Sequence, residues 1–185
     1  MPTAATIIPA SEFKAHHLVP ADDTARDSVF VSLIEASLAQ VENETGRTLT
    51  DKTVTETFTP DYKDTAVMLF HEGIAVADAV DASYVDEDGE AQTVSCDLTR
   101  VGDMRAHIYP ATGEWPDTYC DELGNRTPFT VALTLTGPDA ANIPAPLKNA
   151  AILIARFLDD GGALAEIPRH GAVQVLLAPY RRVSF

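Results

Sequence analysis

Cysteine, basic residues and long apolar runs are all scarce in this sequence, and each scarcity counts against a class of protein. Only two cysteines, Cys96 and Cys120, occur in 185 residues, too few for a fold held by a disulfide framework. The 13 lysines and arginines stand against 28 acidic residues, and this net charge of −15 is unlike that of a protein that reads duplex DNA. The longest apolar run, residues 150–155, is far short of the ~20 residues that cross a bilayer core, so we expect no membrane contact.

Sequence motifs of metal sites and of common enzyme classes are also absent. There is no HExxH, CxxC or Asp-rich calcium loop, and no GxSxG or Gly-rich phosphate loop ending in Lys-Ser or Lys-Thr. We therefore expect no catalytic residues, no metal and no cofactor. The alternative is a small metal-dependent hydrolase that uses Asp86, Asp88 and His107. Because the two acids flank a predicted hairpin turn, we favour a role for them in forming and solubilising that turn.

The composition that remains is that of a globular protein with unevenly spread charge. The apolar fraction is 45%, and the length suits one domain or one domain with an insertion. Residues 1–92 carry 18 acids and 5 bases (net −13), whereas residues 93–185 carry 10 acids and 8 bases (net −2). The surplus acid serves either solubility or a specific electrostatic role. The first residues, MPTAATIIP, lack the features of an export signal, so we expect synthesis in a reducing cytoplasm.

Residues 1–51 are predicted to be helical. Ser11 is a suitable cap for a short helix that runs through His17, and Asp22 or Asp23 is a suitable cap for a longer one. The longer helix should bury one face and end at Gly46, in the left-handed conformation that glycine adopts cheaply. That face has apolar residues three or four positions apart: Phe30, Leu33, Ile34, Leu38 and Val41.

The middle of the chain, residues 52–137, has the alternating pattern of strands. Residues 53–59 and 129–136 alternate between apolar and polar side chains, and residues 67–70 and 105–109 are shorter candidates. Residues 82–85 and 91–94 flank an Asp-Gly pair, which is typical of a hairpin turn. Residues 110–128 are rich in Gly, Pro, Asp and Asn and should form an exposed excursion.

Helix is predicted again in residues 143–185. Pro146 is suited to the first turn of a helix that Gly161 and Gly162 end, and residues 172–177 should form a last short helix before Pro179. The fold class is therefore α+β. A small helical bundle of the N- and C-terminal segments should carry the β-rich region as an insertion, all within one domain.

Two groups of side chains are candidate contact residues. Trp115 stands in a loop, where it is either an interface anchor or a cover for the end of the sheet. The chain ends in an apolar and aromatic segment with two arginines, residues 175–185, where terminal residues are usually polar and frayed. This segment either contacts a neighbouring subunit or folds back on its own core.

Several segments, taken in order, resemble the head–tail connector (adaptor) proteins of long-tailed bacteriophages, prophages and gene transfer agents. The similar motifs cover most of the chain: Phe13-Lys14-Ala15-His16-His17-Leu18, Asp22-Asp23, Leu33-Ile34-Glu35-Ala36, Glu44-Thr45-Gly46-Arg47-Thr48-Leu49, Ala82-Ser83-Tyr84-Val85-Asp86-Glu87-Asp88-Gly89, Glu114-Trp115-Pro116, Ile143-Pro144-Ala145-Pro146-Leu147-Lys148-Asn149-Ala150-Ala151 and Val175-Leu176-Leu177-Ala178-Pro179-Tyr180-Arg181.

The resemblance implies a non-enzymatic part of the virion neck, made in the bacterial host. Such proteins assemble as rings, typically dodecamers, on the portal protein of the DNA-filled head. They extend the channel for DNA ejection and present a surface to a stopper or tail-completion protein, and DNA passes without being bound. The resemblance assigns portal docking to the C-terminal segment: Leu176, Leu177, Pro179, Tyr180, Arg181, Arg182 and Phe185. Trp115 and Tyr84 are further interface candidates, and acids of the N-terminal half are expected to line the channel.

Overall fold

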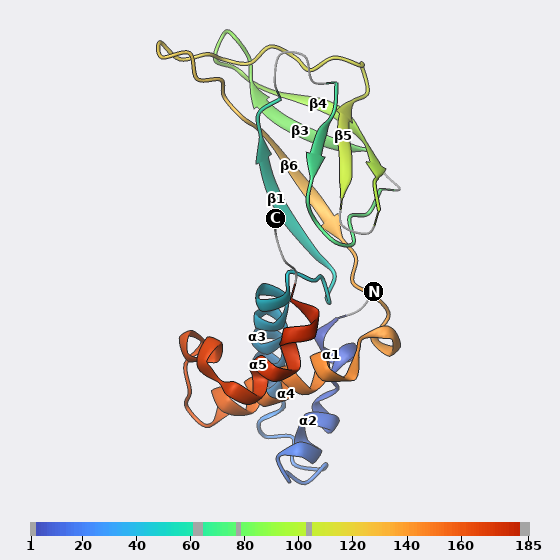
Figure 1. Cartoon of the computed structure of the whole chain (residues 1–185), viewed down its shortest axis with the longest axis vertical. Helices are drawn as coiled ribbons and strands as arrows, with labels where there is room; N and C mark the ends of the chain where they lie inside the picture. The colour runs from blue at the N-terminus through green and yellow to red at the C-terminus, as the bar shows by residue number, and fades with distance from the viewer. Residues whose placement is uncertain (1–2, 61–64, 77–78, 103–104, 182–185) are drawn as a thin grey trace. The chain divides into compact units, whose positions relative to one another are not determined.

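The computed structural model describes residues 3–60, 65–76, 79–102 and 105–181, and they form two compact units. The helical unit consists of residues 1–51 and 137–185, and the β unit consists of residues 52–136 (Figure 1). The β unit is thus inserted, in sequence, between the two segments of the helical unit. Helices and strands are segregated along the chain, as the predicted α+β class requires. Among the described residues, no helix is both long and apolar enough to cross a membrane.

The helical unit contains five α-helices and three 3-10 turns among its described residues. They are α1 (Ala4–Ile7), α2 (Ala10–His16), α3 (Asp27–Thr45), η1 (Ala140–Asn142), α4 (Ala145–Asp159), η2 (Leu164–Arg169), α5 (Gly171–Leu177) and η3 (Ala178–Tyr180). Helix α3 packs against α4, and α4 packs against α5. Their shared core includes Phe30, Ile34 and Leu38 of α3 and Leu147 and Ile154 of α4, all almost fully buried. The apolar spacing that predicted α3 therefore identified the face that it buries.

The two N-terminal helices begin at other residues than the sequence indicated. Pro9, not Ser11, is the residue before α2, because the fixed φ of proline suits the start of a helix. Helix α3 begins at Asp27, four residues after Asp23, because the Asp23 side chain is engaged in a turn where its Oδ1 accepts from the backbone N–H of Ala25 at 3.1 Å. The predicted end of α3 is confirmed, since Gly46 is left-handed with φ of 67°.

The β unit is a six-stranded antiparallel sheet in the order β1-β6-β3-β4-β5-β2. The strands are β1 (Lys52–Phe58), β2 (Val67–Leu69), β3 (Val80–Val85), β4 (Ala91–Arg100), β5 (Ala106–Pro110) and β6 (Phe129–Leu135). The predicted hairpin is confirmed as β3 and β4, which pair from Val85 and Ala91 outward. Strand β4 is longer than expected, so Cys96 lies inside it rather than after it, and burial raises the pKa of this thiol to about 11.

The sheet curls because two segments share one edge of β6. Near its start, β6 pairs with β3 through Ala82 and Val131, and near its end Leu135 bridges to Ile74. Ile74 follows β2 after a short turn. The chain thus passes from β2, at the far edge of the sheet, directly to a bridge with β6. The guanidinium of Arg100, at the end of β4, donates to the Ile74 carbonyl at 2.8 Å and holds this segment in place. The curled sheet encloses the second apolar core, separate from that of the helical unit.

Candidate functional site

The C-terminal segment is folded onto the helical unit as far as the structure describes it. Leu177 is fully buried in the core, and Leu176 and Tyr180 are partly buried against it. Pro179 and Arg181 are exposed, while Arg182 and Phe185 lie outside the described residues. Of the two readings that the sequence left open, the structure shows the folded-back one for residues 176–181. Portal docking by these residues stays a prediction.

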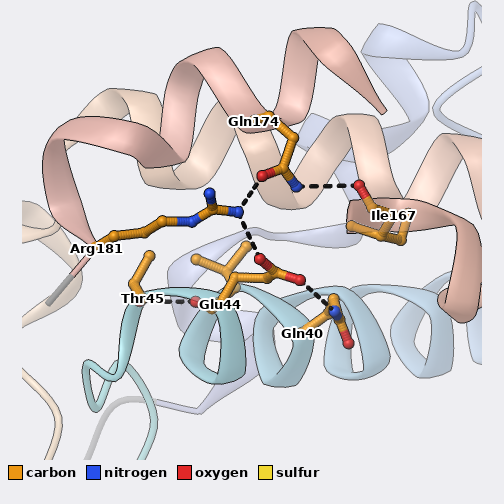
Figure 2. Close-up of polar contacts among 7 residues, drawn as sticks. Gln40, Glu44, Thr45, Ile167, Gln174 and Arg181 are labelled. Atoms are coloured by element: carbon orange, nitrogen blue, oxygen red, sulfur yellow. Dashed lines mark hydrogen bonds and ion pairs between the residues drawn. The ribbon is translucent and has the colours of Figure 1, made fainter. Parts of the chain in front are cut away.

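Arg181 links this segment to α3 and α5. Its Nη2 donates to Oε2 of Glu44 at 2.7 Å and also to Oε1 of Gln174 (Figure 2). Both acceptors are held in turn, since Gln174 Nε2 donates to the Ile167 carbonyl at 3.1 Å and Gln40 Nε2 donates to Glu44 Oε1 at 3.2 Å. The Arg181 side chain is 41% exposed and that of Glu44 is 15% exposed, so solvent reaches one side of the pair.

A second arginine, Arg47, contacts the C-terminal segment at Tyr180, one residue before Arg181. Arg47, which follows α3, donates from Nε to the Tyr180 carbonyl at 3.4 Å. Its Cζ lies 5.8 Å from the centre of the Tyr180 ring, within cation–π range. Tyr180 is therefore held at both its backbone and its ring, directly before the exposed Arg181.

Trp115 and Tyr84 meet in an aromatic cluster of the β unit. The Trp115 ring centre lies 5.0 Å from that of Phe129 and 5.3 Å from that of Phe58, and Tyr84 lies 5.1 Å from Phe129. Trp115 thus covers the sheet, one of its two predicted roles. Its buried Nε1 has no hydrogen-bond partner among the described residues. An interface role for Trp115 or Tyr84 stays a prediction.

The acids of the hydrolase alternative are not brought together with its histidine. Asp86 accepts from the backbone N–H groups of Glu90 (2.9 Å) and Asp88 (3.1 Å), and these bonds with one from Gln92 lower the pKa of its carboxyl. It is a turn-forming residue, as favoured above. His107 pairs with Thr99, eight residues beyond the start of β4 and so about 27 Å along the strand from the hairpin. No group of three or more metal-ligating side chains occurs among the described residues.

The sequence did not indicate two features of the helical unit. Leu18 has a φ of 56°, and it is the one non-glycine residue with positive φ in the described part of the chain. Its side chain is 92% exposed, and Val175 of α5 is 74% exposed. A signal for Leu18 existed, because an apolar residue directly after a predicted helix end occupies the position that usually holds glycine.

The net negative charge is distributed between the two structural units in a different way from its distribution between the two halves of the sequence. The β unit, residues 52–136, carries 16 acids and 5 bases, a net charge of −11. The helical unit carries 12 acids and 8 bases, a net charge of −4. Most of the net negative charge therefore belongs to the inserted β unit.

Solved structures of gene transfer agent (GTA) particles contain chains with the same fold. In the neck of an empty GTA particle computed with C6 symmetry, the similar chain has a TM-score of 0.65 at 21% identity, covering 100% of this chain and 95% of that one. Chains in the virion of a native GTA particle and in its neck computed with C12 symmetry have TM-scores of 0.63 and 0.61, each at 21% identity and covering 100% of this chain and 94% of the other. The chain matches no protein-family model and no curated protein.

Proposed function

We propose that this chain is a structural, non-enzymatic protein of the virion neck, where it forms a ring between the portal of the DNA-filled head and the tail or the next neck protein. The observation that carries the proposal is the likeness to the GTA neck chain, which spans 100% of this chain and 95% of that one. Both units are included in that likeness, so the inserted β unit belongs to the shared architecture. The motifs that resemble the connector family, which occur in this chain in the same order as in that family, support the same role.

A ring requires contacts between two different faces of each copy. The similar chains come from necks whose structures were computed with C6 and C12 symmetry, and this supports repetition of the present chain around an axis, with a dodecamer as the proposed stoichiometry. The partners in this proposal are other copies of the chain, the portal protein, and a stopper or tail-completion protein.

We assign portal docking to the residues from Pro179 onward, with Leu177 as the anchor of the segment. The Arg181–Glu44 pair is partly solvated, and such pairs contribute only about 0–1 kcal/mol, so the portal can replace it at little cost. Leu177, by contrast, is fully buried in the helical core, and its removal from that core would cost several times more. On docking, we therefore expect Arg181 and the residues after it to detach from the helical unit, while the residues up to about Tyr180 stay in place. Arg181 is then available to the portal.

The charge of the β unit suits a part of the ring that faces passing DNA. A net charge of −11 repeated in each copy repels phosphate at close range, within the ~8 Å over which charge acts at physiological salt. Acids between residues 52 and 92 would then line the channel and let DNA slide. If these residues face outward in an assembled ring, this part of the proposal is wrong.

Removal of residues 181–185 tests the docking assignment. We expect the shortened chain to bind the portal at least about tenfold more weakly, because it loses the charge of two arginines and the end segment. Its melting temperature should change little, since every buried residue of α5 is retained. Arg169→Ala, which removes an exposed arginine outside the segment, is the matched control. Calorimetric titration with portal rings gives both affinities, and equal affinities of the shortened and full chains would contradict the assignment.

A further inference from the structure

Leu18 occupies a backbone position that is unfavourable for leucine. Helix α2 ends in a Schellman arrangement, in which the N–H of Val19 donates to the Lys14 carbonyl at 3.0 Å. The residue before Val19 must then be left-handed, and Leu18 has a φ of 56°. Glycine or asparagine adopts this conformation with less steric conflict, because the Cβ of leucine crowds the backbone there.

The side chain of Leu18 does not offset this strain within its own copy. It is 92% exposed, whereas Val19 next to it packs on the helical core. Backbone strain of this kind is typical of sites where the side chain has a task outside the local fold. An exposed leucine held on a strained but hydrogen-bonded turn is a fixed apolar projection, suited to packing on an apolar surface of another chain.

Helix α5 presents an apolar surface of the complementary kind. Val173 and Leu177 face the core, so the opposite side of the helix is exposed and bears Ala172, Val175 and Ala178. We call these three residues the α5 face. Val175, at its centre, is 74% exposed, and no charged side chain interrupts the face.

Leu18 and the α5 face lie at different ends of α3. Lys14 of α2 pairs with Asp27 at the start of α3 (Nζ to Oδ1, 2.5 Å), whereas Arg181 after α5 pairs with Glu44 near its end. Helix α3 has 19 residues and is therefore about 28 Å long. Figure 1 accordingly shows α2 at the bottom of the helical unit and α5 beside α3. The two surfaces are therefore well separated on each copy. In a ring, each copy can then use one surface to contact the copy before it and the other to contact the copy after it.

The charges of the two segments are also complementary. Residues 1–51, which include Leu18, carry 8 acids and 3 bases, and residues 137–185, which include α5, carry 4 acids and 5 bases. Net charges of −5 and +1 favour contact of the first segment with the second over contact of either with itself.

We propose that Leu18 of one copy packs against the α5 face of the next copy in the ring. The inference rests on the proposed function, since it assigns residues to the contact that a ring needs. The occupant of the α5 face is thus a second copy of this chain, and the strained turn after α2 is the element that delivers the leucine.

Leu18→Asn distinguishes a contact role of Leu18 from a role in folding. If Leu18 makes the ring contact, this substitution should stabilise the free chain and weaken ring assembly. Asparagine tolerates the left-handed backbone, so the melting temperature of the free chain should rise by about 2–4 °C. The concentration needed for half-assembly into rings should rise about tenfold, because the buried leucine is lost from each contact. Leu18→Gly should act in the same way. Assembly at the wild-type concentration by both variants would overturn the inference.

Leu123→Asn is the matched control, since Leu123 is 87% exposed but lies in the β unit and has no positive φ. We expect it to leave ring assembly unchanged, and a loss equal to that of Leu18→Asn would overturn the specific assignment. Ring formation by the wild-type chain, on portal rings, is measured in the same experiment. If the wild type forms no ring, the proposed function fails. If the wild type forms rings and the Leu18 variants form them at the same concentration, this inference alone fails.

Crosslinking identifies the partner surface directly. In a Cys120→Ser background, Leu18→Cys and Val175→Cys combined should give a ladder of covalent multimers with a short bismaleimide on assembled rings. The remaining Cys96 is buried with a raised thiol pKa and does not compete for the reagent. Each single cysteine variant should stay monomeric on the denaturing gel. Monomers alone from the double variant in assembled rings would contradict contact between Leu18 and the α5 face.

Discussion

Glu42→Ala should lower the free energy of unfolding of the helical unit by about 3 kcal/mol. Oε1 of Glu42 accepts from the backbone N–H groups of Leu49 (2.6 Å) and Thr50 (2.9 Å) and from Oγ1 of Thr50 at 3.2 Å. Glu42 is 6% exposed and Leu49 is 2% exposed, so water does not readily replace the lost acceptor. The alanine variant therefore leaves buried donors unsatisfied, which costs more than the hydrogen bonds themselves.

Urea unfolding followed by helical circular dichroism measures this change. Glu42→Gln keeps an acceptor oxygen at the same place and should cost only about 1 kcal/mol. Glu35→Ala removes an exposed acid of the same helix and should stay within about 0.5 kcal/mol of the wild type. If Glu42→Ala were as stable as Glu35→Ala, the carboxylate would not organise the segment after α3.

Gly73→Ala should destabilise the β unit by about 3 kcal/mol or more. Gly73 has a φ of 75°, and an added Cβ would lie 2.3 Å from the Thr136 carbonyl oxygen, closer than atoms can pack. The same two residues are joined by a bond from the Thr136 N–H to the Gly73 carbonyl at 2.7 Å. Relief of the clash must move the segment that returns from β2 to β6, and so it opens the curled edge of the sheet.

Gly113→Ala is the control for Gly73→Ala. Gly113 has a similar φ of 89° but open space around its Cβ position, so the substitution incurs only the backbone strain of about 1 kcal/mol. Thermal unfolding of both variants, followed by near-ultraviolet circular dichroism of the aromatic cluster, separates the clash from the strain. Equal stabilities of the two variants would show that the return segment does not depend on the close approach of Gly73 to Thr136.

Periodicity predicted the elements that bury one continuous face. The spacing of Phe30, Ile34 and Leu38 identified α3, and the alternation in residues 53–59 and 129–136 identified β1 and β6, because burial of one face requires such repeats. Helix starts were predicted less well, since Asp23 serves a turn as readily as a helix cap. The curl of the sheet depends on a bridge between Ile74 and Leu135, distant in sequence, which no local pattern encodes.

The C-terminal segment shows why composition alone did not assign a site. Leucine, tyrosine and arginine favour both a core and an interface, and here Leu177 serves the core while Pro179 and Arg181 remain exposed. Leu18 is a different case: the sequence places it after a predicted helix end, and the backbone hydrogen bonds of that end show that it is left-handed. Charge counts by sequence halves placed most of the net negative charge in residues 1–92, and the division into units places most of it in the β unit.

The mass of the particles formed with the portal tests the central claim most directly. Purified full-length chain is mixed with portal rings, and the complex is weighed by native mass spectrometry beside portal alone. We expect one ring of the 19.9 kDa chain on each portal ring, with a mass increment that is a whole multiple matching the portal symmetry. Portal rings that gain no mass at saturating chain would contradict a connector role.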